Sequence, residues 1–115
     1  METIQSIEKF RKVLDENEAV LAYFSTEACS VCKVVKPKVV QMISECFPQM
    51  KAVDIDLDKL PELASQICIF TVPTVVVFFD GHETIRKSRA LGINELKAEI
   101  ERPYYLLFEY KHKDK

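Results

Sequence analysis

The sequence predicts an α/β fold in which a mixed four-stranded sheet is covered by helices on both faces. Two observations carry this prediction. Apolar runs of strand length alternate along the chain with segments whose apolar residues recur at helical spacing. The last two strand-like runs are joined directly by Asp80-Gly81, a hairpin turn sequence. Alternation followed by a hairpin favours a mixed sheet over a purely parallel one.

Composition indicates one globular domain and excludes several classes of partner. The chain has 115 residues, of which 48% are hydrophobic and 30% charged, and its formal net charge is -2. No basic stripe is present, so nucleic acid is not an expected partner. No apolar run approaches the roughly 18 residues of a membrane span, so we expect no membrane partner and a cytoplasmic location. Residues 1–103 are expected to form the domain, and 104–115 an extension of the last helix or a tail.

The first part of the chain predicts a helix, a strand and a second helix. Apolar residues at helical spacing over 4–14 predict an amphipathic helix. The continuous apolar run 19–25 predicts a strand that is buried on both faces. A second apolar stripe predicts a helix over 31–46. Pro37 lies inside that helix, where it removes one backbone hydrogen bond and should cause a kink.

The middle of the chain predicts two strands with a short helix between them. Residues 50–55 have the pattern of a short strand, and Pro61 opens a one-sided apolar stripe that predicts a short helix. Residues 74–79 are β-branched or aromatic throughout. This run is the strongest strand signal in the sequence, and its continuous apolar character predicts a central position in the sheet.

The last part of the chain predicts an edge strand and a final helix. Residues 82–88 return from the hairpin turn and are largely charged, as is typical of an exposed edge strand. Apolar residues over 93–100 predict a helix, which Pro103 should break or bend. The aromatic segment 104–108 then either covers the core or exposes an apolar patch, and core cover is the commoner outcome.

The chemistry is expected at Cys29-Ser30-Val31-Cys32, where the first strand gives way to the second helix. The unpaired N–H groups at a helix start carry about half a positive charge and stabilise a thiolate, whose pKa can fall from about 8.5 toward neutrality. Cys29 is therefore the candidate nucleophile. Cys32 follows one turn along on the same helical face and is the candidate resolving thiol.

The residues alone leave other interpretations of this motif open. An isolated Cys-x-x-Cys also fits a pair of buried thiols or metal ligands. A zinc site that used all four cysteines would need two close pairs, and the sequence has only one. Cys46 falls on an apolar helical stripe and Cys68 follows the short third helix, so we expect both to be buried.

Taken together, the motifs resemble those of the thioredoxin family over about residues 4–100. The resemblance implies a thioredoxin fold, a cis peptide bond before Pro73, and a thiol-disulfide oxidoreductase that reduces protein or low-molecular-weight disulfides. Three motifs carry it: Cys29-x-x-Cys32-Lys33 followed by Pro37, Val72-Pro73-Thr74 before an apolar strand, and Phe79-Asp80-Gly81 at the hairpin.

The resemblance also implies the surroundings and partners of the dithiol. We expect no bound cofactor and no metal, disulfide-containing proteins as substrates, and a separate thioredoxin-reductase-like electron donor, because the chain has no nucleotide-binding glycine loop. The alternative function is a thioredoxin-fold peptide-binding or adaptor module without redox turnover. The residues expected at the substrate surface are Ala28, Ser30, Val31, Val72, Pro73 and Arg89.

The sequence departs from the family pattern near the dithiol. Tyr23 stands where the family commonly has a buried aspartate that assists proton transfer. Ala28 replaces a tryptophan and Arg89 a glycine, which predicts a more cationic surface suited to acidic peptides. Asp54 is interpreted as a strand-end acid in solvent; the alternative is that its carboxylate takes over proton transfer.

Overall fold

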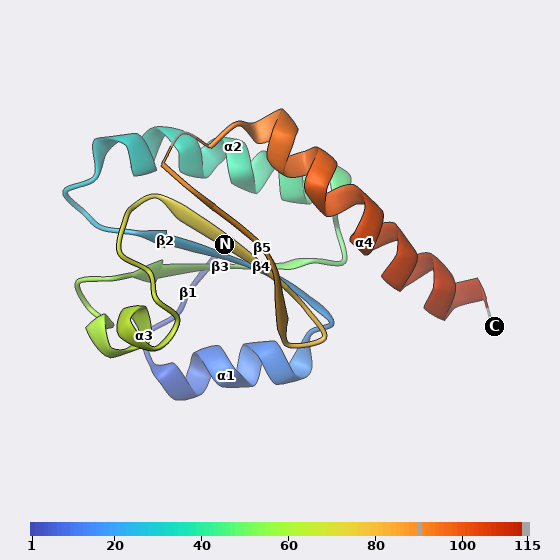
Figure 1. Ribbon diagram of the computed structural model, residues 1–115, viewed down its shortest axis with the longest axis horizontal. Coiled ribbons are helices and arrows are strands. Elements are labelled where there is room, and N and C mark those ends of the chain that lie inside the picture. The colour runs from blue at the N-terminus through green and yellow to red at the C-terminus, as the bar shows by residue number, and fades with distance from the viewer. Residues whose placement is uncertain (90, 114–115) are drawn as a thin grey trace.

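A computed structural model describes residues 1–89 and 91–113 of the chain (Figure 1). It contains each predicted helix and strand, and one strand more. In chain order the elements are β1 Glu2–Thr3, α1 Ile7–Glu16, β2 Ala19–Ser25, α2 Ser30–Cys46, β3 Lys51–Asp56, α3 Pro61–Gln66, β4 Thr74–Phe79, β5 His82–Ser88 and α4 Ile93–Lys113.

The sheet has five strands in the order β1-β3-β2-β4-β5, so the prediction of four was wrong. β3 pairs in parallel with β1 and β2, whereas β4 is antiparallel to β2 and β5, which confirms the mixed sheet. The extra strand β1 is an exposed edge of two residues, paired with Val53 and Asp54. So short a strand carries no alternating apolar pattern, and only its partner β3 makes it a strand.

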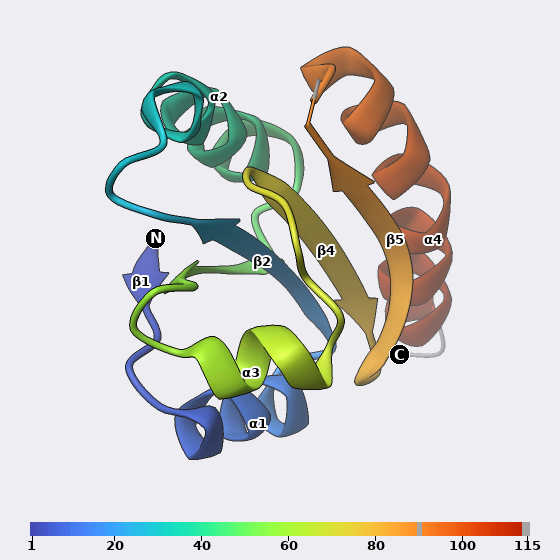
Figure 2. The same cartoon turned by 60° about the vertical axis from the view of Figure 1, so that its left-hand side comes forward.

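Helices cover both faces of the sheet, as predicted, and the structure places two on each face. Figure 2 shows α2 and α4 together on one face and α1 with α3 on the other. Each pair encloses its own cluster of buried apolar side chains against the sheet. The alternate residues of β2 divide between the clusters: Leu21 and Tyr23 face α2, whereas Val20 and Phe24 face α1. Burial on both faces explains why this strand reads as one continuous apolar run.

The hairpin between β4 and β5 turns at Asp80 and Gly81, as predicted. Both residues have positive φ values, of 53° and 80°. Two successive left-handed residues are what a tight hairpin turn requires, and glycine adopts this conformation without strain from a side chain. The turn returns β5 along the edge of the sheet that ends beside the dithiol.

α1 begins later than the sequence pattern indicated. Ser6 caps the helix, its Oγ accepting a hydrogen bond from the Lys9 N–H at 3.1 Å. Ile4, which we predicted as the first apolar residue of this helix, lies outside it. Its side chain is still buried, and its N–H donates to the Asp54 carbonyl at 2.9 Å. Ile4 had matched the helical spacing because it packs against the same core cluster from the connection that precedes the helix.

α4 continues through Pro103 to Lys113, so residues 104–113 extend the last helix, which is one of the two predicted alternatives. Packing beyond the proline accounts for this helix length. The centres of the Tyr104 and Phe47 rings are 4.9 Å apart, and Phe108 is also buried. Tyr104 and Phe108 thus cover the core, while Tyr105 is exposed. Residues 114 and 115 of the predicted tail lie outside the described residues. Within the described part of the chain, no helix combines the length and apolar character needed to cross a membrane.

Candidate active site

Cys29 caps the N-terminus of α2. Its backbone N–H donates to the Thr26 carbonyl at 3.2 Å, which turns the chain from β2 into the helix. Its Sγ accepts a hydrogen bond from the backbone N–H of Cys32 at 3.1 Å. The sulfur therefore occupies the position that a serine or aspartate oxygen takes in ordinary helix caps. Negative charge on a sulfur at this place is stabilised by the N–H groups of the first helical turn.

Cys32 lies one turn later and is joined to Cys29 in a disulfide bond. The two Cα atoms are 5.3 Å apart, within the range of about 4.4–6.8 Å that disulfides show. The two partners differ in accessibility, because Cys32 is only 2% exposed whereas Cys29 is half-buried and lines a pocket. The start of α2 thus holds two sulfurs at bonding distance, with one of them open to other molecules.

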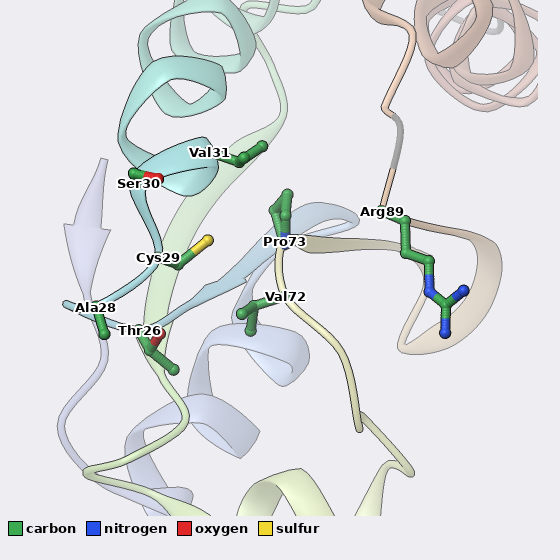
Figure 3. A pocket seen from close by; sticks show the side chains of 8 residues that line it. All are labelled: Thr26, Ala28, Cys29, Ser30, Val31, Val72, Pro73 and Arg89. Atoms are coloured by element: carbon green, nitrogen blue, oxygen red, sulfur yellow. The ribbon is translucent and has the colours of Figure 1, made fainter.

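A pocket of about 680 Å³ opens beside Cys29 (Figure 3). The structure brings all six residues predicted at the substrate surface to the wall of this pocket. Thr26 also lines it, although no sequence motif marked that residue. The signal that could have found Thr26 is its place in the short turn before Cys29. The lining residues are Thr26, Ala28, Cys29, Ser30, Val31, Val72, Pro73 and Arg89.

The loop that ends in Val72-Pro73 forms the wall of the pocket opposite α2. The peptide bond between these two residues is cis, as the sequence motif predicted. Figure 3 shows both side chains facing the start of α2, with Cys29 across from them. Val72 and Pro73 thus line the same pocket as Cys29, from the opposite wall.

Arg89 lies at the far rim of the pocket. Its φ of 63° is in the left-handed region, which is uncommon for a residue with a side chain. The backbone is held there because the Arg89 N–H donates to the Pro73 carbonyl at 3.1 Å. In Figure 3 the guanidinium group points away from the Cys29 sulfur. The positive charge is thus near the entrance and not against the reacting atoms.

Asp54 is not the solvated strand-end acid that we favoured from the sequence. Its side chain is 13% exposed, and Oδ2 lies 2.7 Å from Nζ of Lys36 on α2. Asp54 also lines a second pocket that includes Cys32. The solvated interpretation was wrong because α2 passes over the end of β3, and one strand of sequence does not show what covers it. Lys36 was not among the predicted site residues. The signal that could have found it is its position one helical turn after Cys32.

Tyr23 is fully buried beneath the first turn of α2. Its hydroxyl donates a hydrogen bond to the Cys32 carbonyl at 2.7 Å. Burial, together with the negative charge of Asp54, raises the pKa of Tyr23 from its ordinary value of 10.0 to about 12. The phenol is therefore neutral at physiological pH, and its hydrogen bond fixes the backbone of Cys32.

The other two cysteines lie outside this site. Cys46 is half-buried against the core, while Cys68 is exposed, so the expectation of a buried Cys68 was wrong. Cys68 has a φ of 57° at the turn that follows α3, and its carbonyl accepts a hydrogen bond from Arg86 at 2.9 Å. Across the described residues, no three His, Cys, Asp or Glu side chains are grouped as metal ligands.

Comparisons with known proteins agree with this geometry. A family model described as Thioredoxin matches residues 2–102. The thioredoxin-like protein YdfQ of Bacillus subtilis is 31% identical over 106 residues, 92% of this chain and 91% of its own. A bifunctional thioredoxin reductase/thioredoxin of Mycobacterium leprae is 32% identical over 83 residues, 72% of this chain but 18% of its own. A mutant thioredoxin from Halobacterium salinarum superposes with a TM-score of 0.80 at 30% identity, covering 90% of this chain and 88% of its own.

Proposed function

Because the chain belongs to the thioredoxin family and is thereby a thiol-disulfide oxidoreductase, we propose that it works as a reductase of protein disulfides through Cys29 and Cys32. The observation that carries the proposal is the position of the Cys29 sulfur. It caps α2 at the edge of an open pocket, while its bonded partner is buried behind it. This arrangement gives the two sulfurs different tasks.

The reaction runs in two thiol exchanges. In the first, the Cys29 thiolate attacks a substrate disulfide, forms a mixed disulfide and releases one substrate sulfur as a thiolate. In the second, Cys32 loses its proton and attacks the Cys29 sulfur. The second substrate sulfur leaves and is protonated, and Cys29 and Cys32 end as a disulfide. Two electrons pass from the dithiol to the substrate, and the protein ends in the state that the structure shows.

The pocket beside Cys29 supports an extended peptide as the substrate. Its walls come from the start of α2 and from the Val72-Pro73 loop, and Arg89 supplies a charge at the rim. The backbone of Val72 is placed to pair with a passing strand, which gives affinity with little sequence selection. Ala28, Ser30 and Val31 would contact the substrate from the helix side. Arg89 would favour substrates with acidic residues near the cysteine.

A separate reductase would return the electrons. The chain has two glycines in all, and one of them, Gly81, belongs to the hairpin turn. This is too few for a nucleotide-binding glycine loop. The Mycobacterium leprae relative is named as reductase and thioredoxin in one protein, which supports a partner of that kind here. We also propose a location in the cytoplasm, where such a reductase keeps dithiols reduced. The domain comprises residues 1–103 and is extended by the rest of α4, whose Tyr104 and Phe108 pack into its core.

Reduction of insulin by dithiothreitol tests the proposal against a binding module without redox turnover. We expect the Cys29→Ser variant to lose the acceleration that the wild-type protein gives, by about 100-fold or more. Cys68→Ser is the matched control, since it removes an exposed cysteine outside the pocket and should leave the rate unchanged. Equal acceleration by wild type and Cys29→Ser would reject the reductase in favour of a peptide-binding function.

A further inference from the structure

The buried thiol of Cys32 needs a group that takes its proton. In the second exchange Cys32 must become a thiolate before it attacks, yet its side chain is 2% exposed. A buried thiol is harder to ionise than a solvated one, because burial disfavours the charged form. Its proton therefore has to move through a path built into the protein.

A second pocket, of about 260 Å³, reaches Cys32, and Thr26 lines both this pocket and the pocket beside Cys29. Its volume accommodates several water molecules, and its lining is polar enough to hold them. Six of its ten lining residues are charged, three acidic and three basic. They are Glu27, Lys33, Lys36, Asp54, Asp56 and Lys59, together with Thr3, Ser25, Thr26 and Cys32.

Asp54 lines this pocket together with Cys32 and with Lys36 of α2. It is paired with Tyr23 across β2 and β3, so both side chains stand on the sheet face that α2 covers. Tyr23 reaches the Cys32 carbonyl at 2.7 Å. Oδ2 of Asp54 lies 2.7 Å from Nζ of Lys36, and its Oδ1 accepts a long hydrogen bond of 3.5 Å from the Ser25 hydroxyl. The carboxylate is thus held in place under the turn that carries Cys32.

The other two acids of the pocket, Asp56 and Glu27, are less well placed to take a proton from Cys32. Oδ1 of Asp56 accepts a hydrogen bond from the Asp58 N–H at 2.9 Å, which caps the turn after β3. Glu27 is an exposed residue of the loop before α2. Asp54 differs from both, because it is largely buried and is fixed by a lysine one helical turn from Cys32. The titratable groups that face it are Tyr23 from β2, Lys36 and Lys33 from α2, and the pocket residues Glu27, Asp56 and Lys59.

We propose that Asp54, positioned by Lys36, accepts the proton of Cys32 through the pocket that the three residues share. The inference rests on the proposed reductase function and names a residue for its second exchange. The proton passes from the Cys32 thiol through pocket water to the Asp54 carboxylate as the new sulfur–sulfur bond forms. It then passes to the substrate thiolate that leaves, so that Asp54 is a carboxylate again at the end.

Single-turnover stopped flow separates the two exchanges. The reduced protein, in a Cys46→Ser/Cys68→Ser background, is mixed with dithiobis-nitrobenzoate, an aromatic disulfide whose released thiolate absorbs visible light. The first equivalent of thiolate reports attack by Cys29 and the second reports resolution by Cys32. For Asp54→Asn we expect the second phase to slow about tenfold or more near neutral pH, with the first phase within about twofold of its parent.

The pH profile and two further variants distinguish proton transfer from a structural role. The defect of Asp54→Asn should shrink as the pH rises, because hydroxide can then take the Cys32 proton in place of the carboxylate. Asp54→Glu should recover most of the second phase, and Lys36→Met should slow that phase alone. Asp58→Asn is the matched control, because it removes the same charge from an exposed position outside the pocket.

Three results would overturn the inference. They are a second phase within about twofold of its parent in Asp54→Asn, an equal slowing of both phases, and a defect that does not change with pH. Failure of the proposed function gives a different result, since the parent protein would then show no fast first phase at all.

Discussion

The two sulfurs of one disulfide face different surroundings, although only two residues separate them. The pocket beside Cys29 is lined mostly by small or apolar side chains and has a single charged residue, Arg89. The pocket that reaches Cys32 is lined mostly by charges of both signs, including the Asp54–Lys36 pair. On our two proposals, the pocket beside Cys29 contacts a peptide, and the pocket that reaches Cys32 carries protons.

This difference follows from the geometry of the helix start. Cys29 caps the helix at the pocket edge, whereas Cys32 lies within the first turn and is directed toward the core. The Tyr23 hydroxyl holds the carbonyl of that turn, and β3 brings Asp54 beneath it. Two cysteines of the same chemistry thus acquire distinct surroundings from what the sheet places next to each of them.

The largest effect should come from removing the sulfur of Cys32 alone. In Cys32→Ser, Cys29 can still attack a substrate disulfide, but no second thiol releases the product. Insulin reduction should fall by about 100-fold or more, while a stable mixed disulfide accumulates on Cys29. Mass spectrometry under non-reducing conditions measures the adduct. A Cys32→Ser protein that turned over at half the wild-type rate would show that the division of roles is wrong.

An intermediate effect is expected at Tyr23, whose hydroxyl contacts the Cys32 carbonyl. Its pKa of about 12 in the folded protein exceeds its ordinary value of 10.0, so between these values the unfolded chain releases the proton first. The unfolded state then binds fewer protons, and the free energy of unfolding decreases as the pH rises. Between about pH 9 and about pH 11.5, wild type should lose about 2 kcal/mol more than Tyr23→Phe.

Urea denaturation of the oxidised proteins measures this difference. At neutral pH the wild-type protein should be the more stable of the two by about 1 kcal/mol, because Tyr23→Phe lacks the hydrogen bond to the Cys32 carbonyl. The larger loss in wild type should make Tyr23→Phe the more stable protein at high pH. Parallel pH profiles for the two proteins would mean that Tyr23 does not keep its proton in the fold as described. Tyr105→Phe, on the exposed side of α4, is the matched control.

The smallest effect is expected at the rim of the substrate pocket. Arg89→Gln should lower kcat/KM about threefold for a disulfide peptide with acidic neighbours, and leave it unchanged for a neutral one, since exposed charges interact weakly. The difference should vanish in high salt, which screens such charges. Arg102→Gln, exposed on α4 away from the pocket, is the control. Equal losses for acidic and neutral peptides would show that Arg89 shapes the pocket but does not select by charge.

Much of the fold could be predicted because its signals are local. The strand Thr74–Phe79 and the hairpin at Asp80-Gly81 were predicted with the bounds that the structure has. The continuous apolar run of β2 was correctly interpreted as a strand covered on both faces. In contrast, β1 depends on an edge of β3 that is free to receive it, and no pattern within two residues could reveal such a pairing.

The same division holds within the candidate site. The spacing of Cys29 and Cys32 at a strand-to-helix junction indicated the dithiol, and the family resemblance was needed to choose it over a pair of buried thiols or metal ligands. The burial of Asp54 could not be predicted, because it depends on where α2 crosses β3 and on a lysine 18 residues away in the chain. Cys68 was misjudged for a related reason, since its exposure depends on the turn after α3 and on how that turn meets Arg86.

By itself, the sequence determined where the candidate dithiol lies and which elements carry it, because helix caps, turns and apolar periodicity act over a few neighbouring residues. Only the tertiary structure decided which sulfur is open to substrate and which lies over a charged pocket. Those properties arise where strands and helices that are distant in the chain pack together, and burial and charge pairing are set by that packing.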